Sequence, residues 1–246
     1  MNEKSSTEGT QMVNIKIDGR KVKAEKGTTV LQNAHKLRIE IPTLCSHKDL
    51  SPFGACRLCV VEIKTNGSWQ LSTSCDAPVK EGMEVRTDTD RVREGRKLAA
   101  ELLYYRYPTT GAVREMAKKL GVDVAEGRAD DHDCILCGLC TRTCREVVGV
   151  DALTFMDRGP GRNIDEPKIE YIADACIGCG SCAFVCPTGF IKMEDKNGQR
   201  TIWEKDFKME TCAVCGRYFA PVDQLRWISK KTGVPYEKLT TCTSCR

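Results

Sequence analysis

Two nearly identical cysteine runs constrain this chain more than any other feature of its sequence. Both follow the spacing Cys-x2-Cys-x2-Cys-x3-Cys: the first comprises Cys134, Cys137, Cys140 and Cys144, and the second Cys176, Cys179, Cys182 and Cys186, which Pro187 follows. Three closely spaced thiolates on one tight loop fit three irons of a cubic [4Fe–4S] cluster, and the fourth follows a few residues later. A repeated four-cysteine spacing is highly specific, so it predicts two iron–sulfur cubes and argues against structural or disulfide cysteines.

The two runs resemble the ligand sets of bacterial-type ferredoxins, in which the fourth cysteine of each run binds the other cluster. The resemblance implies crossed sets. Cube 1 is then held by Cys134, Cys137, Cys140 and Cys186, and cube 2 by Cys176, Cys179, Cys182 and Cys144. Gly138, Gly178 and Gly180 lie between the ligands, where the missing side chain lets backbone amides approach the sulfides.

The cysteine content also bears on the compartment. Sixteen cysteines in 246 residues would suit a secreted disulfide scaffold. However, the first residues are polar, without the apolar stretch of a signal peptide, and no apolar run is long enough for a transmembrane helix. We therefore expect a cytoplasmic metal protein with no membrane association.

The formal net charge of +4 counts every cysteine as neutral, whereas metal ligands are thiolates. Each predicted metal site carries about −2, so four such sites bring the net charge to about −4. No dense run of Lys or Arg occurs. We therefore expect no nucleic-acid binding, and a redox-sensing zinc or iron–sulfur regulator is only a distant alternative.

Residues 12–90 are predicted to form a β-grasp domain behind a disordered polar tail, residues 1–11. An alternating strand over 12–17, the hairpin signal Asp18-Gly19, a returning strand over 21–24 and a threonine-capped helix from 28 give this order. Four cysteines follow as predicted ligands of a [2Fe–2S] cluster: Cys45, Cys56, Cys59 and Cys75. Zinc at this set is the alternative, and His47 is expected to be a bystander.

This cysteine spacing and the string Gly-Ala-Cys-Arg-Leu-Cys-Val-Val-Glu at 54–62 resemble the [2Fe–2S] domain of the large iron–sulfur subunit of respiratory complex I. Iron-only hydrogenases and some NAD-dependent formate dehydrogenases begin with the same module. In those families the next stretch holds a further cluster on a histidine and three cysteines. Tyr107 and Gly111 stand here at the positions of the histidine and the first cysteine, so the resemblance implies that this cluster is absent.

Residues 91–127 are accordingly predicted to remain as a helical spacer with helices over 91–107 and 111–120. Leu98, Leu102 and Leu103 are expected on one face of the first helix. Residues 128–200 are predicted to form the dicluster [4Fe–4S] domain, with strands over 152–156, 167–172 and 190–193.

The last segment, 201–246, carries two further cysteine pairs, Cys212, Cys215, Cys242 and Cys245. The string around Cys212 resembles a zinc knuckle, and two such pairs complete a closed four-cysteine zinc site. A further iron–sulfur cluster is the alternative. An amphipathic helix is expected over 222–232, with Trp227 suited to a docking surface. The predicted fold is thus α+β and multidomain: a β-grasp domain, a helical spacer, a dicluster ferredoxin domain and a zinc-ribbon-like module.

The sequence contains no dinucleotide-binding glycine motif, no Walker motif and no Ser-His-Asp set, so we expect no catalytic residues and no enzyme activity of the chain alone. The chain resembles the small iron–sulfur subunit of Sporomusa-type electron-bifurcating transhydrogenases. That resemblance implies flavoprotein partners, one with FMN and NAD(H) and one with FAD, and exchange of electrons with ferredoxin. The iron–sulfur subunit of an NAD-dependent formate dehydrogenase or a hydrogenase is the alternative.

Overall fold

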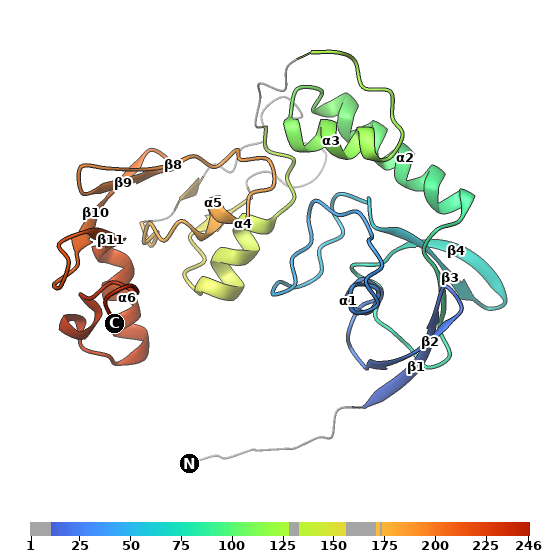
Figure 1. The fold of residues 1–246 in the computed structure, drawn as a ribbon, viewed down its shortest axis with the longest axis horizontal. Helices are drawn as coiled ribbons and strands as arrows, with labels where there is room; N and C mark the ends of the chain where they lie inside the picture. Colours follow the sequence, from blue (N-terminus) through green and yellow to red (C-terminus); the bar gives the residue numbers. More distant parts are fainter. Residues whose placement is uncertain (1–10, 128–132, 156–170, 173) are drawn as a thin grey trace. The chain divides into compact units, whose positions relative to one another are not determined.

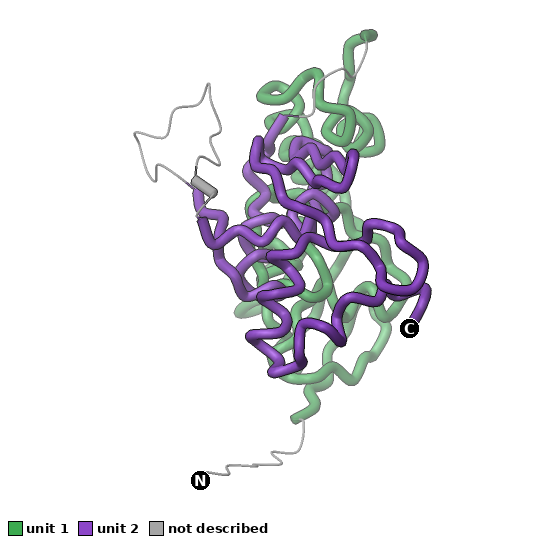
Figure 2. Tube along the Cα trace, turned by 90° about the vertical axis from the view of Figure 1, so that its left-hand side faces the viewer, with its two compact units in different colours: residues 1–131 green, residues 132–246 purple. Residues whose placement is uncertain are grey.

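The computed structural model describes residues 11–127, 133–155, 171–172 and 174–246. The chain divides into two compact units, residues 1–131 and residues 132–246 (Figure 2). The predicted tail lies outside the described residues apart from Gln11, and the predicted domain boundaries stay predictions. No helix within the described ranges is long and apolar enough to cross a membrane.

The first unit is built on a five-stranded sheet with the order β2-β1-β5-β3-β4 (Figure 1). Strand β1 (Met12–Ile17) pairs antiparallel with β2 (Arg20–Glu25) and parallel with β5 (Glu84–Arg86). Strand β3 (Val60–Thr65) pairs antiparallel with both β5 and β4 (Ser68–Thr73). Helix α1 (Val30–Lys36) packs its buried residues into the same core, so the architecture fits the predicted β-grasp domain.

Local sequence explains these elements. Val13, Ile15 and Ile17 alternate with exposed residues and lie in the core. Asp18 and Gly19 have φ values of 49° and 79°, as a tight two-residue hairpin turn requires, and the Asp18 carboxylate accepts hydrogen bonds from the backbone N–H and hydroxyl of Thr87 at 2.7 and 2.6 Å. Thr29 caps α1 in a reciprocal capping box with Gln32.

The two predicted spacer helices are present as α2 (Asp90–Arg106) and α3 (Gly111–Lys119). Glu62 of β3, almost fully buried, ties the start of α2 to the sheet through Thr89 Oγ1 at 2.9 Å and Arg91 Nη1 at 2.8 Å. Leu98 and Leu102 share a face of the helix, but their side chains are 57% and 64% exposed, respectively. The buried face of α2 instead carries Val92, Arg96, Ala100 and Tyr104.

The second unit begins with short elements around the two cysteine runs. They are α4 (Leu139–Arg142), the π-helix η1 (Thr143–Val148), α5 (Ser181–Phe184) and the strand pair β6 (Leu153–Thr154) and β7 (Tyr171–Ile172). The strands predicted over 152–156 and 167–172 thus contain shorter strands, and residues 156 and 167–170 lie outside the described part of the chain.

A four-stranded antiparallel sheet follows, with the order β11-β10-β9-β8. It comprises β8 (Met193–Lys196), β9 (Gln199–Ile202), β10 (Lys205–Thr211) and β11 (Tyr218–Pro221). The strand predicted over 190–193 begins only at Met193, because Ile191 and Phe190 pack into the core beside the cysteines. Helix α6 (Val222–Thr232) has the predicted bounds, and a 3₁₀ helix, η2 (Tyr236–Leu239), precedes the last cysteine pair.

Candidate functional site

The first unit buries four cysteine side chains together. Cys45, Cys56, Cys59 and Cys75 are each less than a tenth exposed. The sulfurs of Cys45 and Cys56 lie 3.4 Å apart, and Cys59 forms a hydrogen bond with Cys75. The four thiols therefore form two close pairs, and a [2Fe–2S] cluster needs such an arrangement because each of its two irons takes two thiolates.

The loop that carries the first pair is shaped to donate hydrogen bonds to sulfur. The backbone N–H groups of Leu44 and Cys56 donate to the sulfurs of Cys56 and Cys45 at 3.5 and 3.4 Å. Gly54 has a φ of 67°, and a Cβ there would lie 2.7 Å from Asp76 Oδ2. Amide donors stabilise thiolates rather than thiols, so this loop fits a negatively charged cluster.

The four thiols differ in acidity. Hydrogen bonding from Cys75, opposed by burial, lowers the pKa of Cys59 to about 6. Hydrogen bonding to Cys59 together with burial raises the pKa of Cys75, and the corresponding bond to Cys45 together with burial raises that of Cys56. Metal binding requires all four as thiolates, so cluster assembly must release protons from this site.

Arg96 is a buried cation whose charge interacts with Cys59. Arg96 of α2 is only 8% exposed, its Nε donates to the carbonyl of Val60 at 3.0 Å, and its Nη2 has no hydrogen-bond partner. Burial lowers the pKa of Arg96, and the charges of Asp88 and Cys59 oppose this effect. Sequence reasoning missed Arg96, because the helical pattern pointed to the leucines of α2.

In the second unit, one small cavity brings one cysteine of the first run to three of the second. Cys144, Cys176, Cys179 and Cys182 all line it, and its other walls are mainly apolar and include Val150, Leu153, Ile202 and Trp203. This is the grouping that crossed ligation of cube 2 requires. The ligand roles themselves stay a prediction.

The other cysteines gather around α4. Burial raises the pKa of Cys140, and the charges of Cys137, Cys134 and Cys182 add to this effect. Cys186 packs against the core cluster that contains Cys134 and Cys140, and its sulfur lies 3.6 Å from Thr188 Oγ1. Because Cys140 and Cys182 belong to the same buried cluster, the two predicted cube sites are neighbours.

The positions between the predicted ligands require glycine for a second reason besides the approach of backbone amides to the cluster: the backbone has positive φ values, and neighbouring side chains leave little room for a Cβ. Gly138, Gly178 and Gly180 have φ values of 70°, 64° and 79°. A Cβ on Gly178 would lie 2.5 Å from the Phe207 ring, and one on Gly180 would lie 2.5 Å from Met193 Sδ. Side chains from β10 and β8 therefore pack directly against the ligand loop.

The same sheet supplies polar contacts that sequence reasoning missed. Trp203 Nε1 donates to Cys182 Sγ at 3.4 Å, and Arg200 Nη1 donates to the carbonyls of Gly178 and Cys179 at 3.2 and 3.4 Å. Asp195 accepts two hydrogen bonds from Arg200, both at 2.7 Å, and these lower the pKa of Asp195. The hairpin signal Asn197-Gly198 would have indicated this sheet.

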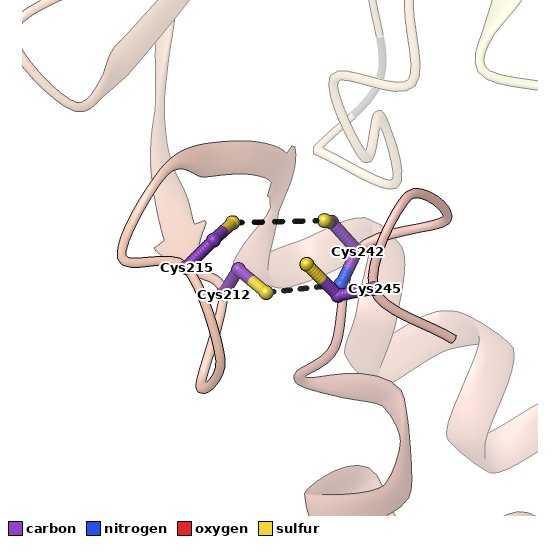
Figure 3. A group of neighbouring side chains, drawn as sticks. All are labelled: Cys212, Cys215, Cys242 and Cys245. Atoms are coloured by element: carbon purple, nitrogen blue, oxygen red, sulfur yellow. Dashed lines mark hydrogen bonds between the residues drawn. The ribbon is translucent and has the colours of Figure 1, made fainter.

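The C-terminal pairs form a compact four-sulfur group (Figure 3). The sulfurs of Cys212, Cys215, Cys242 and Cys245 all lie within 4.8 Å of one another, and those of Cys215 and Cys242 are 3.9 Å apart. Zinc–sulfur bonds of about 2.3 Å give a tetrahedron with edges of about 3.8 Å. The group thus fits a single tetrahedral ion, whereas thiolates on the four irons of a cube stand farther apart.

Backbone donors also favour thiolates at this site. The N–H of Cys242 donates to Cys212 Sγ at 3.4 Å, and such amide bonds lower the pKa of Cys212 to about 6. The backbone and side chain of Arg217 lower the pKa of Cys215. Hydrogen bonding to Cys242 raises the pKa of Cys245 to about 12, so a metal that bound this thiol near neutral pH would have to displace its proton.

Family comparisons agree with these geometries. Residues 10–90 match the 2Fe-2S iron-sulfur cluster binding domain, and residues 127–193 match the 4Fe-4S dicluster domain. The chain is therefore an iron–sulfur protein with both kinds of domain.

More particularly, it is related to the G-type subunit of NADH-quinone oxidoreductase, to NADP-reducing hydrogenase and to the alpha subunit of NADPH-Fe(3+) oxidoreductase. The alpha subunit from Geobacter sulfurreducens is 31% identical over 83% of this chain, and the NADH-quinone oxidoreductase protein from Rhizobium meliloti is 29% identical over 83%. The HndD protein of the NADP-reducing hydrogenase from Solidesulfovibrio fructosivorans is 32% identical over 72%.

The chain spans only 27% of the length of the first two relatives and 35% of the third. A solved structure of an NAD+-reducing [NiFe]-hydrogenase is 26% identical, with a TM-score of 0.49 over 60% of this chain and 71% of that one. The predicted resemblance to the complex I subunit and to hydrogenases is confirmed by the sequence relatives.

Proposed function

We propose that this chain is an electron-transfer subunit of an NAD(P)-linked oxidoreductase complex. The observation that carries the proposal is the adjacency of the two predicted cube sites, because Cys134 and Cys140 of the first run and Cys182 of the second belong to one buried cluster. A cluster-to-cluster path of this kind passes single electrons. In support, each related protein is named as an oxidoreductase or hydrogenase that uses a nicotinamide nucleotide or reduces one.

In this proposal the clusters, when bound, supply one-electron redox chemistry, and the protein holds them and excludes water. The [2Fe–2S] cluster is assigned to the four buried cysteines of the first unit, cubes 1 and 2 to the crossed sets, and zinc to the C-terminal four. The C-terminal ion is structural, since four protein thiolates leave no open position for a substrate.

The finer proposal is a cytoplasmic, electron-bifurcating complex. One flavoprotein partner carries FMN and binds NAD(H), another carries FAD, and ferredoxin exchanges electrons with the assembly. The resemblance to small subunits of Sporomusa-type transhydrogenases and the replacement of the histidine ligand by Tyr107 support this assignment. Tyr107 is buried at the end of α2, and its hydroxyl accepts a hydrogen bond from Arg106 at 2.8 Å, so a packed side chain stands at the position of the histidine ligand in the complex I and hydrogenase families.

Anaerobic metal analysis with EPR on the purified chain tests the cofactor assignment. We expect about ten irons and one zinc per chain, with one [2Fe–2S] and two [4Fe–4S] signals. The Cys215→Ser variant should lose zinc and keep its iron, while Cys56→Ser should lose the [2Fe–2S] signal and keep zinc. About fourteen irons without zinc would show that the C-terminal site holds a further cluster.

Anaerobic purification of the tagged chain from its native host tests the partners. We expect co-purifying chains with both FMN and FAD, and reduction of a nicotinamide nucleotide by the complex but not by the chain alone. A molybdenum or hydrogenase subunit in place of the FAD protein would favour the formate dehydrogenase or hydrogenase alternative. Turnover of NADH by the isolated chain with ferredoxin would contradict the subunit role.

A further inference from the structure

Trp203 occupies an unusual backbone position. It forms, with Glu204, the two-residue turn between β9 and β10, and the two have φ values of 54° and 59°. Left-handed backbone is unfavourable for side chains with a Cβ, and such turns normally carry Asn or Gly. The preceding turn, Asn197-Gly198, follows that rule with φ values of 50° and 78°. Backbone strain of this kind persists where the side chain has a role, so the contacts of the Trp203 side chain indicate what that role is.

The indole points at cube 2. Its Nε1 donates to the sulfur of Cys182 at 3.4 Å, and the residue lines the cavity that Cys144, Cys176 and Cys179 share with Cys182. Phe190 packs against the indole with a centroid distance of 6.3 Å and an interplanar angle of 63°. The ring is therefore fixed from one side, and its single donor is directed at a predicted ligand sulfur.

We propose that Trp203 is a positioning residue that raises the reduction potential of cube 2 through this N–H···S hydrogen bond. The proposal rests on the proposed function, which assigns a [4Fe–4S] cluster to this site. Reduction adds one electron whose charge spreads over the cluster and its thiolates, so a hydrogen bond to a ligand sulfur is stronger in the reduced state. The bond stabilises the reduced cube and makes cube 2 easier to reduce.

The surroundings favour a strong effect. The cavity is walled by apolar side chains such as Val150 and Leu153, where a hydrogen bond to charge is weakly screened. Arg200, a basic side chain of the sheet that contacts the same loop, is paired with Asp195 through two hydrogen bonds. The indole N–H is uncharged and does not titrate, so it changes the reduction potential of cube 2 without making that potential depend on pH.

An EPR-monitored redox titration of the holoprotein tests the proposal. Trp203→Phe keeps an aromatic ring and removes the donor. At a fixed potential, the ratio of reduced to oxidised cube should fall by about threefold to tenfold, a shift of about 30 to 60 mV to more negative values for a one-electron couple. Only one of the two [4Fe–4S] midpoints should move, and the [2Fe–2S] midpoint should stay. Trp69→Phe, in the first unit, is the matched control and should shift none of them.

A second readout separates the hydrogen bond from simple packing. In protein labelled with ¹⁵N at the indole nitrogens only, pulsed EPR of the reduced cube should detect one coupled nitrogen. This coupling should vanish in Trp203→Phe and persist in Phe190→Leu, which disturbs the ring contact but retains the donor. Should Trp203→Phe assemble poorly, the midpoint can be followed in Trp203→His, which retains an N–H donor and should show a smaller shift than that expected for Trp203→Phe.

The outcomes are distinct. Wild-type protein with both cubes, but with no indole coupling and an unchanged midpoint in Trp203→Phe, would overturn the role of Trp203 and leave the cluster assignment standing. Wild-type protein without [4Fe–4S] signals would overturn the proposed function and this inference together. Equal shifts in Trp203→Phe and Trp69→Phe would also refute the inference, because the shift would then not depend on the donor to Cys182.

Discussion

Replacing Gly178 with alanine tests whether the β8–β11 sheet is packed directly onto the cluster-binding loop. The added Cβ would lie 2.5 to 2.9 Å from three atoms of the Phe207 ring, at the ring's attachment point and its two neighbours. Phe207 is 6% exposed, so the ring has no free space into which it can retreat. Gly178 also has a φ of 64°, which alanine adopts at a cost.

The two costs can be separated with a matched control. Left-handed backbone costs alanine about 1–2 kcal/mol, and overpacking in a filled core costs about 1–3 kcal/mol more. Gly233→Ala, in the same unit, has a φ of 73° and no atom within 4 Å of its added Cβ, so it incurs the backbone cost alone. We therefore expect Gly178→Ala to destabilise the second unit by about 2–5 kcal/mol and Gly233→Ala by about 1–2 kcal/mol.

Urea unfolding of the anaerobic holoprotein, followed by circular dichroism, measures the difference. With a slope of about 2 kcal/mol per molar urea, the clash alone lowers the midpoint of Gly178→Ala by about 0.5–1.5 M relative to Gly233→Ala. The double variant Gly178→Ala/Phe207→Leu should recover part of that difference, because leucine removes the ring edge. Equal midpoints for the two single variants would refute direct packing of Phe207 on the loop.

Two further predictions concern charge. Arg96→Met should shift the [2Fe–2S] midpoint to more negative values in an EPR titration, because it removes a buried cation whose charge acts on Cys59. Lys97→Met, on the exposed face of α2, is the control and should leave the midpoint unchanged. Equal midpoints for the two variants would contradict the role of Arg96. Burial and then a hydrogen bond to Glu210 raise the pKa of Tyr236 to about 12, so the difference between the absorbance titrations of wild type and Tyr236→Phe should show one tyrosine ionising near pH 12. Because the folded pKa is raised, the stabilising contact is fully present below pH 10 and is lost as pH rises to 12; a difference curve centred at pH 10 would disprove it.

The helices, the first hairpin turn and the C-terminal cysteine group can be predicted from the sequence, because each of them needs particular residues at a fixed spacing along the chain. The helix over 222–232 and the two spacer helices follow from the helical periodicity of their sequences. The Asp18-Gly19 turn was readable because positive φ values favour those residues. The C-terminal cysteines were also readable, since a closed four-sulfur group needs two tight pairs.

Other features could not be read because tertiary packing overrides the local pattern. The leucine face of α2 is exposed, since Arg96 and Tyr104 fill the buried side that periodicity assigns to apolar residues. The Trp203-Glu204 turn carries none of the residues typical of its backbone. Its position depends on Cys182 and Phe190, which lie 21 and 13 residues earlier in the chain. A pattern along the chain does not contain that information.

Two elements of the C-terminal segment, β10 and α6, pack beside residues around the predicted cube 2 site. Strand β10 starts two residues after Trp203, presents Phe207 to Gly178 and ends one residue before Cys212. Helix α6 approaches the turn after Cys144, where Lys231 Nζ would lie 2.6 Å from a Cβ on Gly149, and the same ammonium stacks over the Trp227 ring at 4.5 Å. A tetrahedral ion on the four C-terminal cysteines would fix the end of β10 and, through η2, helix α6, which packs against that strand. Metal binding at this predicted site would therefore hold β10 and the adjoining Trp203 turn in place and keep the Trp203 donor aligned with Cys182.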